Sequence, residues 1–299
     1  MSIVRLVALV LLALAPTSLA AQETKLDTNA IEKMSELKGA YIPEENVFKI
    51  GKPRNDVKIT VDGWSMPPFM GLGSWAAFTP AHGRTMMMGD TVVFEDEVNP
   101  AMSAALEAGL EVTALHNHFF FDSPKVYFMH IGGMGDAGQL AAGVKKVYDT
   151  IAEIRRTKPE VGRNFPRTIA NTNAISPNTL DQILGLKGQE SQGMVKFVIG
   201  RPAKMHGATV GKEMGINTWA AFAGSDTEAV VDGDFAMTAN ELQPVLKAMR
   251  KEGINIVAIH QHMSHEEPRY LFLHYWGKGP ATALAQSLKR VLDIQKAIQ

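Results

Sequence analysis

The 299-residue chain is long enough for one or two domains, and its 45% hydrophobic and 20% charged residues are typical of a soluble globular protein. With 30 basic and 31 acidic side chains its formal net charge is −1, which argues against nucleic acid as a partner, because phosphate binding needs a basic excess. The chain has no cysteine, which excludes disulfides, thiolate metal ligands and cysteine nucleophiles. Any bound metal would therefore be held by His, Asp, Glu or Met.

The N-terminus has the pattern of a secretory signal peptide. Arg5 precedes an apolar run, Leu6–Ala15, which is too short to span a bilayer. Ser18 and Ala20 place small residues at the −3 and −1 positions of a cleavage site. The sequence thus predicts cleavage after residue 20, a periplasmic or secreted protein, and no transmembrane segment in the mature chain; an uncleaved N-terminal anchor is the alternative.

The rest of the chain contains one unit twice. The stretch Gly71–Phe78 matches Gly215–Phe222 at an offset of 144 residues, and the offset persists to the end of the chain. Upstream the offset is 149, which implies a five-residue indel; the matching stretches there are Asn29–Gly39 with Asn178–Gly188 and Gly51–Pro53 with Gly200–Pro202. We therefore place copy one at 26–155, a polar linker at 156–174 and copy two at 175–299.

Both copies predict the same elements in the same order. In copy one these are a helix at 29–38, short strands at 47–50 and 57–61, a hairpin of 75–79 with 84–94, a helix from the N-cap Asp96 to Gly109, strands at 111–121 and 125–131 around a turn at 122–124, and a closing helix at 136–155. In copy two the central helix begins at Asn240 and ends at Gly253. This order indicates an α+β fold with a largely antiparallel sheet, and we expect the copies to pack about a pseudo-twofold axis.

Six of the nine histidines recur in both copies. At the offset of 144 the pairs are His116 with His260, His118 with His262, and His130 with His274. On a strand, residues i and i+2 project from one face, so the first two histidines of each set should share a face. A three-residue turn would place His130 opposite His116, and a five-residue turn would place it opposite His118.

Three imidazoles on adjacent strands can bind one metal ion. Zinc sites of this kind keep an open fourth position for water, so we favour zinc as the divalent ion, with copper or iron as alternatives. The alternative without metal is a structural role, or a ligand pocket, for the histidines. Asp122 and Glu266 follow the second histidine of each set by four residues. They could support a metal ligand or add a fourth, but a solvated turn carboxylate is the favoured interpretation.

Other motifs have simpler explanations. The Gly133–Gly138 stretch fits G-x-G-x-x-G but follows a hairpin strand, which indicates a strand-to-helix turn rather than a nucleotide site. Met86–Met88 have no methionine counterparts in copy two, so core packing accounts for them better than copper ligation. Trp75 and Trp219 are expected in core strands, and Glu97 with its counterpart Glu241 at a helix N-terminus.

The combined features resemble the LppY/LpqO family of exported bacterial proteins over most of the mature length. These features are the signal peptide, the duplicated unit, the G-x-G/N-x-W-A-A-F stretch, and A-L-H-N-H or A-I-H-Q-H followed by a third histidine. Mycobacterial members include lipoproteins, and this chain lacks the cysteine used for lipidation. The resemblance implies export and the two-repeat architecture, and it transfers no catalytic residue.

Two functions follow from the sequence. The first is a periplasmic metal-dependent hydrolase, in which each His set holds an ion that activates water. The second is a non-catalytic envelope protein that binds a metal ion or a small-molecule ligand. A further alternative is an interaction module without metal. The sequence assigns no catalytic residue.

Overall fold

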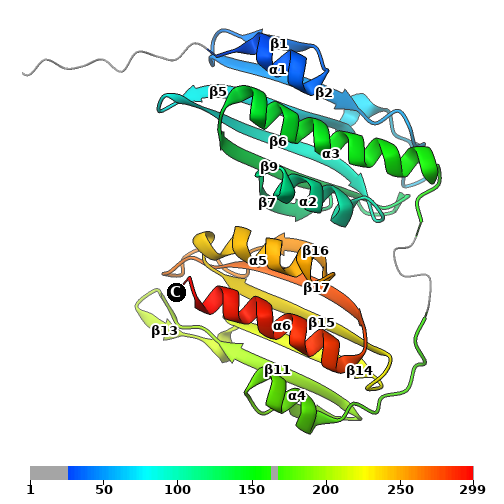
Figure 1. Cartoon of the computed structure of the whole chain (residues 1–299), viewed down its shortest axis with the longest axis vertical. Coiled ribbons are helices and arrows are strands. Elements are labelled where there is room, and N and C mark those ends of the chain that lie inside the picture. The colour runs from blue at the N-terminus through cyan, green and yellow to red at the C-terminus, as the bar shows by residue number, and fades with distance from the viewer. Residues whose placement is uncertain (1–25, 163–167, 299) are drawn as a thin grey trace, which may run out of the picture.

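The computed structural model describes residues 26–162 and 168–298, so the predicted signal peptide at 1–20 lies outside the described residues. Each half forms the same α+β unit, which confirms the predicted tandem duplication (Figure 1). Copy one contains α1 (Thr28–Ser35), β1 (Gly39–Ile42), β2 (Val47–Pro53), β3 (Thr60–Val61), β4 (Trp64–Ser65), η1 (Pro68–Met70), β5 (Gly73–Ala81), β6 (Arg84–Phe94), α2 (Val98–Glu107), β7 (Glu111–His116), β8 (Asp122–Ser123), β9 (Val126–Gly135) and α3 (Ala137–Thr157).

Copy two repeats this order, except that the described residues include no counterpart of β8. It contains α4 (Pro177–Leu184), β10 (Gln189–Ser191), β11 (Met194–Gly200), β12 (Ala203–Met205), β13 (Ala208–Val210), η2 (Lys212–Met214), β14 (Asn217–Gly224), β15 (Ala229–Met237), α5 (Ala239–Lys251), β16 (Asn255–His260), β17 (Leu271–Gly279) and α6 (Ala281–Lys296). Among the described residues, none of these helices is long and apolar enough to cross a membrane.

The two copies share one antiparallel sheet of twelve strands. Its order is β1-β2-β5-β6-β9-β7-β16-β17-β15-β14-β11-β10, which reads the same from either end when equivalent strands are exchanged. The copies meet at its centre, where Leu115 of β7 pairs with Ile259 of β16. The helices cover one face of this sheet and enclose the main hydrophobic core (Figure 1).

Reciprocal amide hydrogen bonds join the copies on the helical side. The side chain of Asn99 in α2 accepts from the Ile256 N–H (2.8 Å) and donates to the Ile256 carbonyl (3.0 Å). Gln243, its equivalent in α5, makes the same two bonds to Val112, at 3.0 and 2.8 Å. Ile256 and Val112 each adjoin a β-bulge, and the amide side chain of the opposite copy satisfies the backbone N–H and carbonyl of each.

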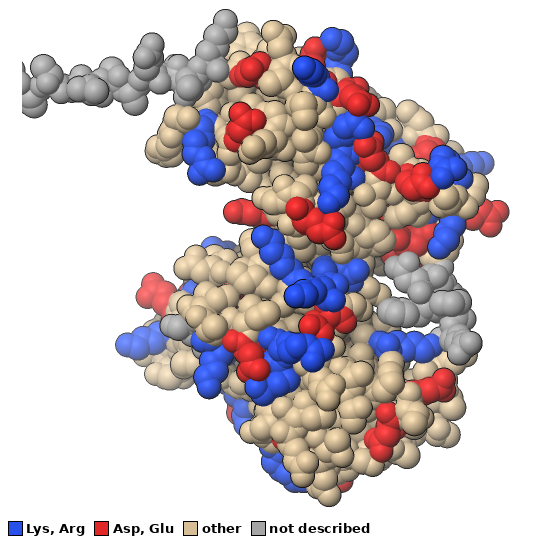
Figure 2. Space-filling view, viewed as in Figure 1, with Lys and Arg blue, Asp and Glu red and all other residues tan. Residues whose placement is uncertain are grey.

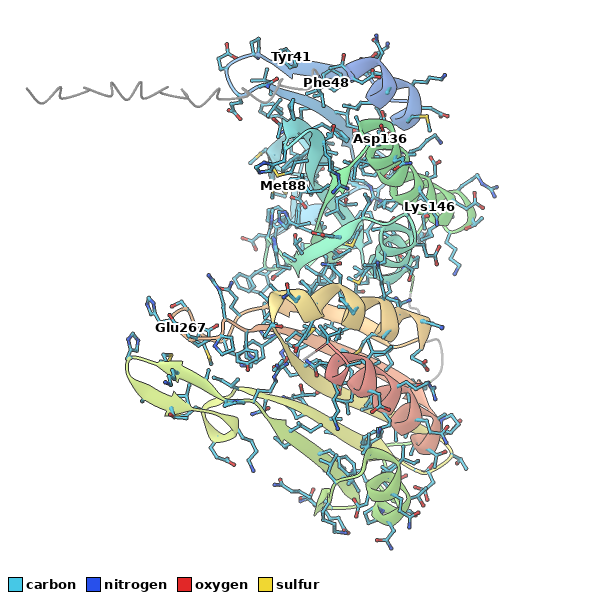
Figure 3. All side chains as sticks on the ribbon, turned by 60° about the vertical axis from the view of Figure 1, so that its left-hand side comes forward. Tyr41, Phe48, Met88, Asp136, Lys146 and Glu267 are labelled. Atoms are coloured by element: carbon cyan, nitrogen blue, oxygen red, sulfur yellow. The ribbon has the colours of Figure 1, made fainter. Side chains whose placement is uncertain are left out.

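The opposite face of the sheet carries a small lid in each copy. In copy one the segment around β3, β4 and η1 packs on Val92, Phe94 and Phe128. In copy two the β12–β13 hairpin packs against Phe272 and Tyr270 through Ala203 and Val210. The backbones of Lys204 and Glu267 form an isolated antiparallel bridge, which ties this hairpin to the connection between β16 and β17 (Figure 3). The central strands lie between the two lids on the face of the sheet opposite the helices, and polar side chains project there.

Charges are mixed over the helical side of the molecule. Figure 2 shows Lys and Arg interspersed with Asp and Glu over this side, which agrees with the net charge of −1. At its N-terminus α3 is capped by Asp136, whose carboxylate accepts from the Gln139 N–H at 2.9 Å (Figure 3).

Several predicted boundaries are corrected by the structure. The strand predicted at 111–121 ends at His116, because residues 122–123 pair with β3 of the lid instead of continuing the hairpin. The predicted N-caps Asp96 and Asn240 are replaced by Glu97 and Thr238, and Thr238 forms a capping box with Glu241.

The five-residue indel falls in two places: two residues in the first hairpin turn, and three between Pro53 and Gly73 of copy one. The β1–β2 turn spans residues 43–46, whereas the β10–β11 turn spans only 192–193, which accounts for two residues. Strand pairing then aligns Pro53 with Gly200, since they pair with the equivalent residues Gly73 and Asn217. The predicted match of Gly51–Pro53 with Gly200–Pro202 is therefore wrong by two residues.

Candidate metal centres

Each copy places an aspartate and two histidines in a row across three adjacent strands. In copy one, Asp90 of β6 pairs directly with His130 of β9, and His116 of β7 lies diagonally beyond it. In copy two, Asp234 of β15 pairs with His274 of β17, with His260 of β16 beyond. The strand neighbours Met129 and Leu115 point into the core under the helices, so these polar side chains project from the opposite face.

The hairpin register differs from both predicted alternatives. His130 pairs with Ala114, and His116 pairs with Phe128, so the two histidines share a face but are diagonal. Residues 117–125 form the connection, so His118 stands outside the strand. Its ring instead stacks on Phe128 at 3.3 Å between centroids, and His262 stacks on Phe272 at 3.6 Å.

In copy one, the ring of His116 lies beside those of both His118 and His130. The Nε2 atoms of His116 and His130 lie 3.0 Å apart, and the rings of His116 and His118 are stacked at 5.1 Å between centroids. Asp90 is buried and its Oδ1 has no hydrogen-bond partner among the described residues. The ligand atoms of Asp90, His116 and His130 are less closely grouped than those of copy two, because among the described residues only the copy-two set has all its ligand atoms within 4.8 Å of one another.

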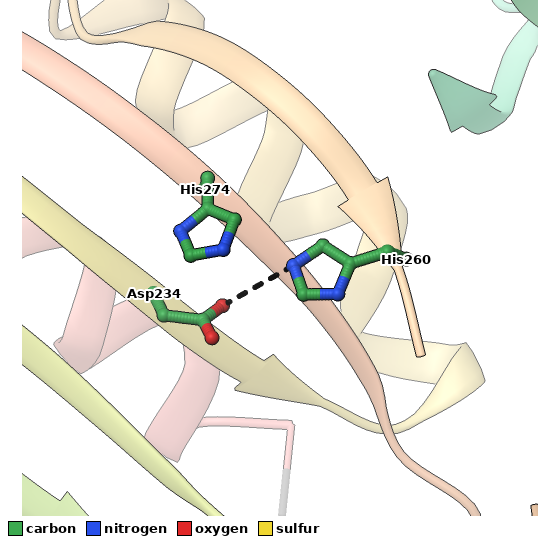
Figure 4. A group of neighbouring side chains, drawn as sticks. All are labelled: Asp234, His260 and His274. Atoms are coloured by element: carbon green, nitrogen blue, oxygen red, sulfur yellow. Dashed lines mark ion pairs between the residues drawn. The ribbon is translucent and has the colours of Figure 1, made fainter. Parts of the chain in front are cut away.

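Copy two brings the carboxylate closer to the imidazoles. Asp234, His260 and His274 each offer a ligand atom, and these atoms lie within 4.8 Å of one another, so the group could hold a metal ion (Figure 4). His260 Nε2 is 3.9 Å from Asp234 Oδ1, and His262 Nε2 is 3.0 Å from Asp234 Oδ2. The third predicted histidine, His262, thus contacts the aspartate rather than joining the closest cluster.

Backbone carbonyls determine which ring nitrogen faces the site. Nδ1 of His262 lies 2.9 Å from the Gly215 carbonyl, and Nδ1 of His274 lies 3.2 Å from the Gly233 carbonyl. A carbonyl only accepts, so each Nδ1 must carry the proton and donate it. In the neutral ring Nε2 then presents a lone pair toward the site, which is the arrangement seen in metal-bound histidines.

Two atoms of the copy-two cluster lack hydrogen-bond partners. Nε2 of His262 lies 3.0 Å from Oδ2 of Asp234, whereas Oδ1 of Asp234 and Nε2 of His260 are buried and have no hydrogen-bond partner among the described residues. Burial raises the pKa of Asp234 above its ordinary value, although the three neighbouring histidines oppose that shift. Burial lowers the pKa of His260, so it favours the neutral ring. The polar cluster is therefore poorly compensated by its own groups and suited to a bound cation.

The sequence analysis did not identify the two aspartates as candidate ligands. Asp90 and Asp234 belong to the repeated Gly-Asp pairs, Gly89-Asp90 and Gly233-Asp234, so duplication alone marked them. They come from a strand that is distant in sequence from the His-x-His motif. Only the β6–β9 and β15–β17 pairing shows that they adjoin the histidines.

Asp122 and Glu266 serve the turns, and their predicted solvation is wrong. Both are buried. Asp122 accepts from the Val126 N–H (2.7 Å) and pairs with Lys125 (2.8 Å), while Glu266 accepts from the Tyr270 N–H (3.0 Å). Neither forms a hydrogen bond or ion pair with the six histidines in the described part of the chain, and each organises the start of the strand that carries the third histidine.

The surroundings of the two centres differ. Phe120 and Phe121, directly after the His-x-His motif of copy one, are each 79% exposed. Their counterparts in copy two are Ser264 and His265, and His265 lies beside His206 with 5.2 Å between ring centroids. The two residues that follow the His-x-His motif by two and three positions are thus exposed and apolar in copy one, and polar in copy two.

Comparison with known proteins identifies the family. The chain belongs to the family described as Domain of Unknown Function (DUF1259), whose model matches residues 29–150 and 178–294. No curated protein matches. Among solved structures, it is similar to a trimeric bacterial microcompartment shell protein, PduB (12% identity, 83% of this chain and 86% of that chain, TM-score 0.23), and to the double-ringed trimeric shell protein MSM0271 from the RMM microcompartment (12%, 74% and 86%, TM-score 0.20).

Proposed function

We propose that the protein is an exported, periplasmic or secreted, metal-dependent hydrolase that holds one divalent ion in each copy. In copy one the ligands are Asp90, His116 and His130. In copy two they are Asp234, His260 and His274. His118 and His262 lie beside these ligands on their aromatic supports, and zinc is the ion we favour, because imidazole and carboxylate ligands with an open position are typical of catalytic zinc.

The orientation of the ring nitrogens is the observation that carries this proposal. The carbonyls of Gly215 and Gly233 each accept from an Nδ1–H, so Nε2 lone pairs gather at a buried carboxylate. In copy one, His116 Nδ1 lies 3.3 Å from the Asn117 carbonyl, which likewise leaves its Nε2 free toward His130. His260, the copy-two equivalent of His116, has the corresponding hydrogen bond with the backbone of Gln261. The repetition of this contact in both copies supports a ligand set rather than incidental polar residues.

Strand spacing favours two separate single-ion sites. The two centres lie over β9 and β17, which are separated by three strand spacings, or about 14 Å. Ions in two-metal catalytic sites are about 3.5–4 Å apart. Each copy is thus expected to bind and act independently.

The chemistry expected of such a site is hydrolysis. A divalent ion with an open position lowers the pKa of a bound water toward neutrality. His262 holds its Nδ1–H on Gly215, so its Nε2 is available to accept a proton beside Asp234. His118 is the corresponding residue in copy one, and burial lowers its pKa, which favours the neutral, proton-accepting form.

The second candidate is a non-catalytic envelope protein that binds a metal ion or a small-molecule ligand. Phe120 and Phe121 support this candidate, because they expose apolar surface of the kind that binds a ligand. It requires metal binding but no turnover.

The test compares stripped and zinc-loaded protein. Hydrolysis of 4-nitrophenyl acetate and bis(4-nitrophenyl) phosphate would be measured before and after removal of metal by a chelator. We expect zinc-dependent turnover that is lost in the double variant His116→Ala/His260→Ala and retained in His82→Asn, which changes a histidine in the β5–β6 turn. Stoichiometric zinc without turnover of either compound would favour the non-catalytic protein.

A further inference from the structure

A cavity lies on the helical side of copy one, away from the metal centres. It has a volume of about 420 Å³ and lies between the end of β2 and the C-terminal half of α3. Its apolar lining comes from Pro53, Ile151, Ala152 and Pro159, and its polar lining comes from Lys52, Arg54, Asn55, Asp56, Ser74, Tyr148, Arg155 and Arg156. Volumes of about 300–1,000 Å³ are typical of small-molecule sites.

Two of these polar side chains are buried and incompletely satisfied. Tyr148 is 3% exposed and Arg155 is 6% exposed. The Tyr148 hydroxyl and the Arg155 Nη1 have no hydrogen-bond partner among the described residues. Arg155 does pair with Asp96 and Glu97 through its other nitrogens, so its charge is balanced while one donor remains unused.

Lys52 adds a cation to the same cavity. Its Nζ lies 5.5 Å from the centroid of the Tyr148 ring, and Lys52 forms no ion pair among the described residues. Arg54, by contrast, is fully engaged by Asp56, Glu97 and the Val92 carbonyl. The unused groups are therefore hydrogen-bond donors, and one of them carries an uncompensated positive charge.

Copy two provides an internal comparison. Lys52 pairs with Ser74 and Ile199 pairs with the equivalent Thr218, so Ile199 occupies the position of Lys52. Leu292 is the counterpart of Tyr148 at the offset of 144. Both apolar residues line a cavity of only about 20 Å³.

Glu97 of copy one and its equivalent Glu241 of copy two also differ in their second buried partner. In copy one, Arg54 and Arg155 contact Glu97. In copy two, Arg201 and the neutral Gln295 contact Glu241. The fold is thus built in copy two without the tyrosine, the lysine or the second arginine, so packing of this unit does not require them.

We propose that this cavity binds a small carboxylate with an apolar body. The carboxylate would accept from Lys52 Nζ, Arg155 Nη1 and the Tyr148 hydroxyl, and the apolar body would lie against Ile151 and Ala152. An acceptor ligand matches three unused donors, and a single negative charge matches the one unpaired cation. The site is on the opposite face of the sheet from the metal centres and is independent of the proposed hydrolysis.

The test uses benzoate as the carboxylate and inorganic phosphate as the comparison anion, with titration calorimetry on the mature chain. We expect benzoate to bind with one site per chain. The variant Lys52→Ile/Tyr148→Leu, which installs the copy-two residues, should weaken binding at least tenfold. Lys49→Ile is the matched control, since it removes the same charge from the exposed side of β2, and it should bind benzoate as the unchanged chain does.

Each result has a defined meaning. Circular dichroism and thermal unfolding would first establish that the double variant is folded. Equal benzoate affinity in a folded double variant, or no benzoate binding by the unchanged chain, would overturn the proposal. Phosphate binding without benzoate binding would also overturn it, because it would show an anion site that does not use the apolar walls.

Discussion

At the scale of single residues, the two aspartates decide whether the histidines form a metal site. A buried carboxylate oxygen without a partner is costly unless a cation compensates it, and both Asp90 and Asp234 have such an oxygen among the described residues. Asp90→Asn and Asp234→Asn should each weaken zinc binding at the affected centre by at least about tenfold, comparable to the loss of a group that tunes a metal site. Competition with a chromophoric chelator would measure this.

Asp62→Asn is the control, because Asp62 is exposed in the lid and asparagine tolerates its positive φ of 51°. Zinc affinity that is unchanged in Asp90→Asn would remove the aspartate from the ligand set.

Glu241 gives a pH-dependent prediction about stability. Burial raises its pKa, but hydrogen bonds from Arg201, the Thr238 N–H and Gln295 outweigh burial, so its pKa lies below the ordinary value. A carboxyl whose folded-state pKa is lowered stabilises the protein above its unfolded pKa, and this stability is lost as the pH falls through the lower folded value. Glu241→Gln should therefore destabilise by about 2 kcal/mol at pH 7, since it leaves Arg201 without its charged partner.

The difference from the unchanged chain should shrink below about pH 4.5. Urea unfolding at pH 7 and pH 4 would check this, and a difference that grows on acidification would contradict the stated cause.

At the scale of elements, the bulged strands β7 and β16 depend on the opposite copy. Asn99→Ala should destabilise the chain by about 1–3 kcal/mol, because it leaves the buried N–H and carbonyl of Ile256 without partners. Gln243→Ala should cost a similar amount through Val112. Chemical denaturation would measure both, and values within about 0.5 kcal/mol of zero for both would show that these amide bonds contribute nothing to stability.

The elements also show what sequence can and cannot predict. The repeat, the helices and the hairpin pair near 75–94 follow from local patterns and from the comparison of two copies. The end of β7 at His116 does not, because it depends on residues 122–123 pairing with β3, more than 60 residues away in the chain. The position of Asp90 beside His130 was not predicted for the same reason, because it depends on the pairing of β6 with β9 and not on local sequence spacing.

Burial was equally beyond local reasoning. Asp122 sits at a turn, where carboxylates are usually solvated, yet it is buried because the lid packs beside it and its oxygens bind Lys125 and the Val126 N–H. The shared face of His116 and His130 was predictable from alternation, but their diagonal offset depends on the length of the connection at 117–125, which the sequence did not define.

At the scale of the whole molecule, the two copies form one sheet and should not behave as separate domains. Leu115 pairs with Ile259 across the junction, and the amide bonds of Asn99 and Gln243 cross it on the helical side. We expect limited proteolysis to cut within 156–174 and the two fragments to remain associated on size exclusion. Fragments that separate and are each fully stable would contradict tight packing.

The central claim is that each copy binds one metal ion on its own aspartate and histidines. Elemental analysis by mass spectrometry of the zinc-loaded chain tests it most directly, together with His116→Ala, His260→Ala and the double variant. The account predicts two equivalents in the unchanged chain, one in each single variant and none in the double variant. Two equivalents retained in a folded double variant would contradict it.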